Sequence, residues 1–372
     1  MIKVLLFGFV GLAYALLIWF ITRGWLRLPV FWPSVLSEVK LSVIVPARNE
    51  EGSIKSLLES LCNQNYPREL YEVIVVNDHC TDSTGSIVQS FIKGNKLPNF
   101  SLINGASYYA VPRKKNALEF GIRHARFNYI VTTDADCIMG RHWLQTIACF
   151  LVQEKADMVI GQVSIIPGRS LFSQFQALEF MSLTGATAGA ARQGHPILCN
   201  GANLIFRKEI FEKTGGYLGN YRYESGDDMF LLHKFKKING IRILPIKSHG
   251  AMVFTLPKAG ISEFLKQRGR WAGKAPGYND KATIITGLVV ACVNIMIVLG
   301  MVSVFFSPVV FAAAFFLLIF KGMVDFPLMW SVSGFLGNRR LLWLYPALLL
   351  VYPIYVTVVL AKGIFFKPGW KL

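Results

Sequence analysis

Three aspartates stand where apolar runs of the sequence end, and carboxylates in such places can bind metal ions and nucleotides. Asp134 and Asp136 follow the run YIVTT (129–133), and Asp78 closes the run EVIVVND (72–78). Around a tight turn, carboxylates two residues apart can both reach one divalent cation, or divide between the cation and a ribose. Mg²⁺ and Mn²⁺ prefer oxygen ligands and bind readily together with substrate phosphates. The spacing therefore favours metal-assisted chemistry on a diphosphate, with exposed turn acids as the alternative.

The elements that must position these acids alternate between strands and helices. Alternating strands and helices imply an α/β fold with a mostly parallel sheet and helices on both faces. Ligands of such sheets bind beyond the carboxyl ends of the strands, so we expect the three acids on one rim. Asn49 is expected to cap the first helix. The expected strands are 40–46, 72–78, 101–103 and 129–136, and the expected helices lie around 54–61, around 87–91 and over 115–125.

The composition indicates a membrane protein with a soluble middle part. Apolar residues make up 53% of the 372 residues and charged residues 16%, against about 25% charged in soluble proteins. The net charge of +17 fits attraction to anionic lipid head groups. We expect no nucleic-acid partner, because no run of Lys and Arg is interleaved with aromatic residues. Six scattered cysteines without a CxxC pair argue against a zinc site or a disulfide framework.

Apolar stretches near both ends of the chain are long enough to cross a bilayer, which takes about 20 helical residues. The first is expected to be a retained anchor, because Arg23 and Arg27 follow it in place of a small-residue cleavage site. The last contains two prolines and is either a bent span or a re-entrant helix. The positive-inside rule places the middle part in the cytoplasm, on the inner face of the cell membrane of a multi-pass protein. The stretches are 4–22, 283–303, 305–330 and 341–361.

Seven segments in order resemble motifs of the family 2 glycosyltransferases, which are inverting enzymes with a GT-A fold. The resemblance covers about residues 40–275, and its last segment is the Q-x-x-R-W signature of the membrane-bound branch. It implies a GT-A nucleotide-sugar-binding domain with a mostly parallel sheet, in addition to transmembrane α-helices at both ends of the chain. The segments are VIVPARNEE (43–51), VVNDHCTDST (75–84), RKKNALEFG (113–121), DAD (134–136), CNGANLIFRKEIFEKTGGY (199–217), SGDD (225–228) and QRGRW (267–271).

The resemblance assigns donor-binding roles to several of these residues. The opening strand and loop would line the base pocket, Asp78 would contact the base or ribose, and Lys114 would approach the diphosphate. Arg113 and Asn116 stand where the family has glycines that flank the lysine. Asp136 is the usual metal ligand and Asp134 its partner, and the implied ion is Mn²⁺ or Mg²⁺. The implied base-pocket residues are Pro46, Ala47, Arg48 and Glu50.

The resemblance also assigns the acceptor side. Asn200 and Gly201 would belong to the floor of the site, and Asp228 would be the catalytic base, with Asp227 beside it where a glutamate is more usual. An inverting transfer needs such a base to take the proton of the acceptor hydroxyl. The alternative for the acidic pair is a helix N-cap. Both roles can hold, with Asp227 as the cap.

The QRGRW segment is expected to be one helical face, since Gln267, Arg270 and Trp271 follow i, i+3, i+4 spacing. Arg270 can bind a diphosphate, and Trp271 can pack beneath the acceptor or a sugar. The alternative is a plain interfacial helix. Residues 171–194 are apolar enough to lie on a membrane surface, and their Gly- and Ala-rich half can pack against another helix.

These expectations combine into a membrane-bound transferase. It would move a sugar from a nucleotide diphosphate sugar, commonly UDP-linked in this family, to a membrane lipid or lipid-linked acceptor. A processive polysaccharide synthase and a nucleotide-binding membrane scaffold are the competing hypotheses. No motif identifies the donor, the acceptor or the oligomeric state. The expected parts are an anchor (1–24), a GT-A domain (38–258), an interfacial region (259–280) and a transmembrane region (281–372).

Overall fold

The computed structural model describes residues 2–34, 37–221, 223 and 226–365. Its contacts divide the chain into two compact units. The α/β unit contains the described residues of 29–166 and 198–256. The helical unit contains those of 2–28, 167–197 and 257–365. Residues 167–197, which the sequence analysis placed within the range 38–258, therefore belong to the helical unit.

The α/β unit is built on a sheet of seven strands in the order β3-β2-β1-β4-β8-β6-β9. Strands β1 to β4 pair in parallel, and β8 is antiparallel to its neighbours β4 and β6. The expected α/β fold with a mostly parallel sheet is thus confirmed. The strands are β1 (Leu41–Ala47), β2 (Tyr71–Asn77), β3 (Phe100–Asn104), β4 (Tyr129–Thr132), β6 (Met158–Ile160), β8 (Leu204–Arg207) and β9 (Ile243–Pro245).

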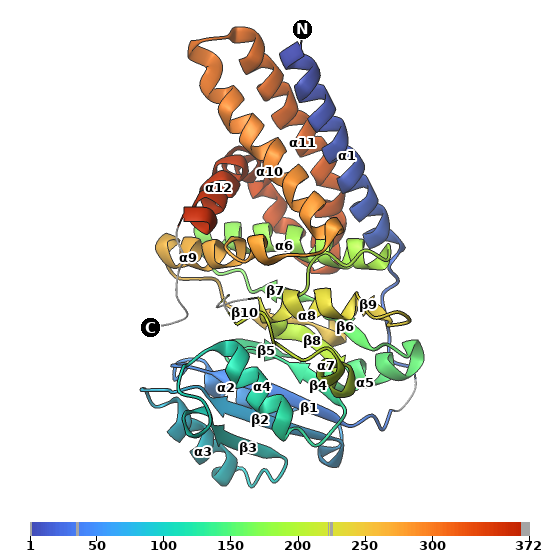
Figure 1. Ribbon diagram of the computed structural model, residues 1–372, viewed down its shortest axis with the longest axis vertical. Coiled ribbons are helices and arrows are strands. Elements are labelled where there is room, and N and C mark those ends of the chain that lie inside the picture. The colour runs from blue at the N-terminus through green and yellow to red at the C-terminus, as the bar shows by residue number, and fades with distance from the viewer. Residues whose placement is uncertain (1, 35–36, 222, 224–225, 366–372) are drawn as a thin grey trace. The chain divides into compact units, whose positions relative to one another are not determined.

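Smaller elements complete the α/β unit (Figure 1). Three short strands form a second sheet in the order β5-β10-β7. Gly121 brings one helix close to the large sheet, since a Cβ there would lie 2.6 Å from Ile44 Cγ2. The short strands are β5 (Cys137–Met139), β7 (Val163–Ile165) and β10 (Val253–Thr255), and the helices are α2 (Ile54–Cys62), α3 (Thr84–Gly94), α4 (Lys114–His124), α5 (Trp143–Glu154), α7 (Lys208–Lys213) and α8 (Asp227–Phe235).

Two local predictions in this unit are wrong. Asn49 does not cap α2, because its backbone is left-handed (φ 52°) and its Oδ1 accepts a hydrogen bond from Thr81 N at 2.9 Å. Ser53 occupies the N-cap position instead. The strand expected over 129–136 ends at Thr132, since Cys137 N donates to Asp134 O at 3.1 Å and closes a turn. The two aspartates therefore lie on a turn that directly follows the strand.

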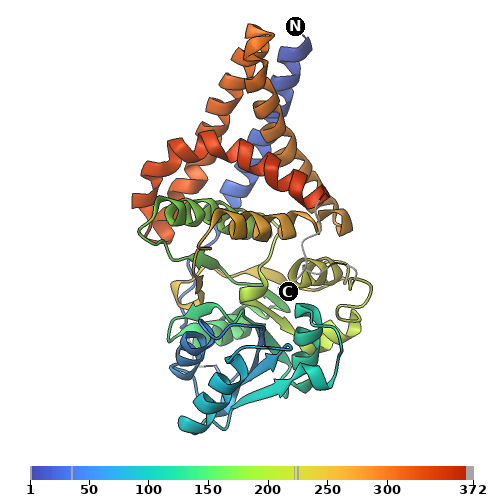
Figure 2. The ribbon, with the colours of Figure 1, turned by 90° about the vertical axis from the view of Figure 1, so that its left-hand side faces the viewer.

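The helical unit contains long apolar helices and two helices that run across them (Figures 1 and 2). Among the described residues, four helical segments, 2–27, 281–305, 308–335 and 339–363, are long and apolar enough to cross a membrane. The last of them includes the stretch expected to be bent or re-entrant, and it contains a helix that continues through Pro353. The helices are α1 (Ile2–Arg27), α6 (Leu171–Arg192), α9 (Ile261–Ala272), α10 (Lys281–Val302), α11 (Pro308–Phe335) and α12 (Tyr345–Phe365).

Small residues let α1 and α6 cross closely. A Cβ on Gly189 would lie 3.1 Å from the carbonyl carbon of Ile21, and a Cβ on Gly24 would lie 2.8 Å from that of Gly189. Glycines at facing positions are a common means of close helix packing in membranes. The Gly- and Ala-rich half of 171–194 therefore packs against another helix, as the sequence indicated.

Candidate active site

The turn after β4 presents Asp134 and Asp136 at the carboxyl end of the parallel strands. Thr133 N donates to Ile44 O at 3.2 Å and so fixes the start of the turn to β1. Thr132 Oγ1 donates to Gly201 O at 2.7 Å, which joins the end of β4 to the segment before β8. About a third of the Asp134 side chain is exposed. The turn thus holds two carboxylates at the rim while leaving them accessible to a ligand.

Lys114 stands at the first position of α4 and joins two acidic segments. Its Nζ lies 2.6 Å from Asp134 Oδ1 and 3.6 Å from Asp227 Oδ2. Burial alone would lower the pKa of Lys114, but the nearby carboxylates, Asp134 foremost, raise it well above its usual value. The side chain is therefore a fixed positive charge between the turn after β4 and the start of α8.

Asp227 and Asp228 form the first turn of α8. Gly226 precedes them with φ 88°, a left-handed conformation that glycine adopts at no steric cost. Gly226 is the N-cap residue, so the prediction that Asp227 caps the helix is wrong. Asp228 Oδ2 accepts from Gly201 N at 3.3 Å, and Oδ1 accepts from Met229 N at 2.7 Å. Backbone donors of this kind favour the ionised carboxylate.

Gly201 lies directly against the acidic pair. A Cβ at this position would lie 2.9 Å from Asp227 Oδ2, 3.5 Å from Lys114 Nζ and 3.7 Å from Asp228 Cβ. Asn200 precedes it, and its Oδ1 accepts from Ala202 N at 3.0 Å. Asn200 thus shapes the turn, and the bare backbone of Gly201 lets the two acids approach.

Asp78 is a buried acid at the end of β2 in the α/β unit. It is 1% exposed, and its Oδ1 accepts from Tyr109 Oη at 2.9 Å. Its Oδ2 is buried and has no hydrogen-bond partner among the described residues. Burial raises the pKa of Asp78, partly offset by hydrogen bonds from Tyr109 and His79. A buried acceptor without a hydrogen-bond donor raises the free energy of the folded state.

The end of β1 and the loop after it contact Asp78 and the start of α3. Pro46 and Ala47 end the fully buried strand β1, and Ala47 O accepts from Asp78 N at 2.8 Å. Arg48 Nη1 donates to Asp78 O at 3.5 Å. Glu50 N donates to Thr84 Oγ1 at 2.8 Å, which ties the loop to the start of α3. Pro46 and Ala47 thus contribute backbone, whereas Arg48 contributes a side chain near Asp78.

Gln267, Arg270 and Trp271 lie on α9, in the helical unit, whereas the acids belong to the α/β unit. Arg268, in the same motif, is a charged residue that is almost fully buried, with 3% of its surface exposed. Its Nη2 donates to Glu179 Oε2 at 2.7 Å, and its guanidinium lies 4.1 Å from the centre of the Trp271 ring.

Models of two families match this chain. The model described as glycosyl transferase family 2 matches residues 42–215, and the one described as glycosyl transferase family group 2 matches residues 129–360. The chain belongs to glycosyl transferase family group 2. The expected family 2 resemblance is therefore confirmed at the level of the family.

Curated relatives match parts of this glycosyltransferase. The probable glycosyltransferase YdaM of Bacillus subtilis is 30% identical over 190 residues, which cover 50% of this chain and 45% of YdaM. The poly-beta-1,6-N-acetyl-D-glucosamine synthase of Staphylococcus epidermidis is 25% identical over 236 residues, 62% of this chain and 53% of the synthase. The chain thus aligns with about half the length of these two relatives.

A solved structure matches the whole glycosyltransferase chain. The mannosyltransferase PcManGT from Pyrobaculum calidifontis, in complex with GDP-Man and Mn²⁺, is 20% identical with a TM-score of 0.61. The match covers 98% of this chain and 99% of that chain. At this identity the likeness establishes a shared fold.

Asp134 and Asp136 suit a divalent cation that takes its remaining ligands from a bound substrate and from water. Among the described residues, no three His, Cys, Asp or Glu side chains are grouped to hold a metal ion by themselves. Mg²⁺ commonly binds through one or two carboxylates and takes its remaining ligands from water and phosphates. Asp134 and Asp136 supply oxygen donors at an accessible turn, which suits this mode of binding.

Three residues that the sequence patterns did not single out, Tyr109, Arg268 and Glu179, contact the predicted site residues or lie in the same motif. Tyr109 contacts Asp78, but it lies between the recognised motifs, and no pattern distinguishes it. Arg268 and Glu179 form a buried ion pair, to which Tyr355 Oη adds a hydrogen bond to Glu179 Oε1 at 3.0 Å. Glu179 as an isolated acid in the apolar stretch 171–194 was the available signal for such a pair.

Proposed function

We propose that this chain is an inverting, divalent-cation-dependent glycosyltransferase that moves a sugar from a nucleotide diphosphate sugar to a lipid or lipid-linked acceptor. The observation that carries the proposal is the cluster of Lys114, Asp134, Asp227 and Asp228 around Gly201. It combines a fixed cation with accessible carboxylates at the rim where parallel α/β sheets bind ligands.

The donor would bind across the residues around Asp78 and the cluster of charged residues around Gly201. Asp78 Oδ2, buried without a donor, would accept from the base or the ribose. Lys114 would approach the diphosphate by exchanging part of its contact with Asp134. Asp134 and Asp136 would hold the divalent cation, which supplies charge neutralisation for the leaving diphosphate.

Asp228 would act as the base. Its carboxylate would take the proton of the acceptor hydroxyl while the hydroxyl oxygen bonds to the anomeric carbon and the bond to the nucleoside diphosphate breaks. Attack opposite the leaving group inverts the anomeric configuration. The hydrogen bonds that Asp228 Oδ2 accepts from Gly201 N and Oδ1 accepts from Met229 N fix the orientation of the carboxylate at the start of α8.

The helical unit supports the proposal of a lipid or lipid-linked acceptor. Four helices are long and apolar enough to cross a membrane, and the apolar chain of such an acceptor dissolves in the same bilayer. Basic residues flank their ends, which under the positive-inside rule favours a cytoplasmic active site on the cell membrane. Gln267, Arg270 and Trp271 on α9 would contribute to binding of the diphosphate and acceptor.

The experiment is a donor panel with product analysis. Detergent-solubilised protein is incubated with UDP-, GDP- and dTDP-sugars, with Mn²⁺, Mg²⁺ or EDTA, with and without a total lipid extract. The proposal expects one nucleotide to be released with metal, faster with lipid, and a single glycolipid with inverted configuration by NMR. An extended polymer would indicate a polysaccharide synthase, and a folded protein that turns over no donor would contradict the enzyme proposal.

A further inference from the structure

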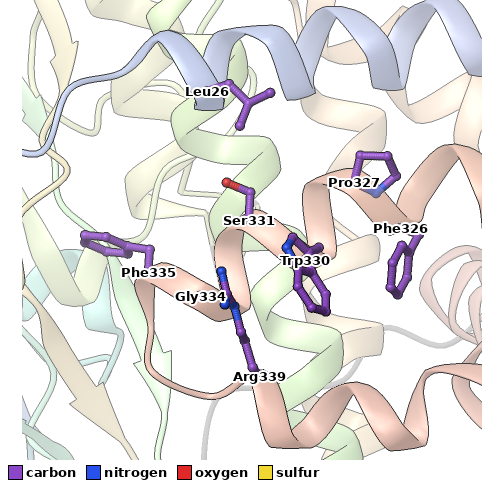
Figure 3. Close-up of a pocket in the computed structure, with 8 residues that line it drawn as sticks. All are labelled: Leu26, Phe326, Pro327, Trp330, Ser331, Gly334, Phe335 and Arg339. Carbon is purple, nitrogen blue, oxygen red and sulfur yellow. The ribbon is translucent and has the colours of Figure 1, made fainter.

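An apolar groove opens on the helical unit at the C-terminal ends of α1 and α11. Its volume is about 610 Å³, within the roughly 300–1,000 Å³ range of ligand pockets. Figure 3 shows Leu26 on α1 opposite the side chains that line the groove from α11. Arg339 lies at one end. The lining residues are Leu26, Phe326, Pro327, Trp330, Ser331, Gly334, Phe335 and Arg339.

The groove lies between two helices that run in the same direction. Tyr14 Oη donates to Asp325 Oδ1 at 2.7 Å, and further along both helices Trp25 Nε1 donates to Ser331 Oγ at 3.0 Å. Basic residues gather at this end of the helices, among them Arg27. If both helices span a bilayer, these arginines and Trp330 lie at the level of the lipid head groups.

The walls of the groove suit a hydrocarbon chain. Phe326 and Trp330 are 40% and 48% exposed, and Leu26 is 61% exposed. Phe326 and Trp330 are four residues apart on α11, so they share one face of the helix about 6 Å apart along its axis. A straight segment of an acyl chain fits along that face, whereas a sugar or a nucleotide would leave its polar groups unpaired against these side chains.

The polar part of the groove is the Arg339 side chain, which has no acidic partner among the residues that the structure describes. The Arg339 guanidinium lies over the Trp330 ring at 4.7 Å, and its side chain makes no hydrogen bond or ion pair with any residue that the structure describes. Gly334 makes room for it, since a Cβ there would lie 3.0 Å from both Nε and Nη2. A guanidinium held in this way can form paired hydrogen bonds to a phosphate.

The charge of the helical unit favours an anionic ligand. Its ranges contain only four acidic residues, and basic residues outnumber them several-fold. Glu179 and Asp325 are already paired with Arg268 and Lys321. Cationic residues at the ends of membrane spans attract anionic head groups.

We propose that this groove binds an anionic glycerophospholipid of the bilayer, with its phosphate on Arg339 and one acyl chain along Phe326 and Trp330. The lipid fills the gap between α1 and α11 at the end where α1 continues into the α/β unit. This site requires that α1 and α11 lie in a membrane, but it does not depend on the proposed transfer reaction.

The test compares Arg339→Gln with Arg340→Gln in the full chain. Arg340 is the adjacent exposed arginine and does not line the groove, so its substitution makes the same change of charge outside the site. Purified protein in detergent is titrated with phosphatidylglycerol or phosphatidylcholine. Retained lipid is counted by native mass spectrometry, and the thermal midpoint reports stabilisation by the bound lipid.

The proposal expects wild type and Arg340→Gln to retain one phosphatidylglycerol and to be stabilised by it more than by phosphatidylcholine. Arg339→Gln should bind it about tenfold more weakly or worse, with an unchanged midpoint in lipid-free detergent. Equal losses in both variants would mean general surface attraction and would overturn the proposal. Unchanged phosphatidylglycerol binding by Arg339→Gln would also overturn the proposed lipid site. If that variant also had a raised KM for the acceptor, the groove would be assigned to the acceptor instead.

Discussion

Replacing Gly201 by alanine puts a methyl carbon 2.9 Å from Asp227 Oδ2, where ordinary contact begins at 3.4 Å. The Asp227 carboxylate must then retreat by about half an ångström, and its neighbours Lys114 and Asp228 must adjust. Misplacing catalytic groups by about 1 Å can cost a hundredfold in rate. We therefore expect Gly201→Ala to lower kcat by about tenfold. The backbone at Gly201 has no positive φ, so alanine itself is tolerated there.

The matched control is Gly94→Ala, at the last position of α3. A Cβ there meets nothing within 4 Å, and its φ is not positive. This variant should keep full activity and gain up to about 1 kcal/mol of stability from its less flexible unfolded chain. The assay is metal-dependent nucleotide release at saturating donor and acceptor, with thermal midpoints measured in parallel. A folded Gly201→Ala protein with wild-type kcat would refute the proposed role of the packed acids.

Three further predictions concern buried charges. Glu179→Gln leaves Arg268 buried and unpaired, which costs about 3–5 kcal/mol; the midpoint in detergent should fall, and adding Arg268→Met should recover part of the loss. Asp325→Asn leaves Lys321, 4% exposed, without its counter-charge, so it should lower the midpoint more than Tyr14→Phe does. Burial raises the pKa of Asp78, so ionisation of Asp78 destabilises the fold as pH rises through that raised pKa. Asp78→Asn should therefore be more stable than wild type at pH 7, and the difference should vanish below about pH 4 in a series of melts.

The strand ends were predictable because the apolar run that forms the buried strand and the acid that follows it are adjacent in the sequence. A short apolar run such as YIVTT is typical of a buried strand in a parallel sheet, so the acid after it lies at the carboxyl end of that strand, on the rim. The limits of the strand were less predictable. The sequence contains no sign that Thr132 is its last residue, because the turn is closed by backbone hydrogen bonds that any residues can make.

Contacts between segments far apart in the chain were beyond the sequence patterns. Asn49 has the chemistry of a helix cap, but its left-handed backbone and its bond to Thr81 depend on a loop 32 residues away. The helical spacing of QRGRW grouped Gln267, Arg270 and Trp271, whereas Arg268 is buried because Glu179 lies opposite it. Periodicity reports the faces of one helix and gives no information on the charge that another helix presents.

The most direct test of the proposed mechanism is the turnover of Asp228→Asn beside Asp228→Glu and wild type, in Mn²⁺ and in EDTA, with donor binding measured separately by calorimetry. If Asp228 is the base, Asp228→Asn should lose about 10²- to 10⁴-fold in kcat. It should bind the donor as wild type does, and Asp228→Glu should recover part of the rate. Wild-type turnover by a folded Asp228→Asn protein would contradict the assignment of Asp228 as the base.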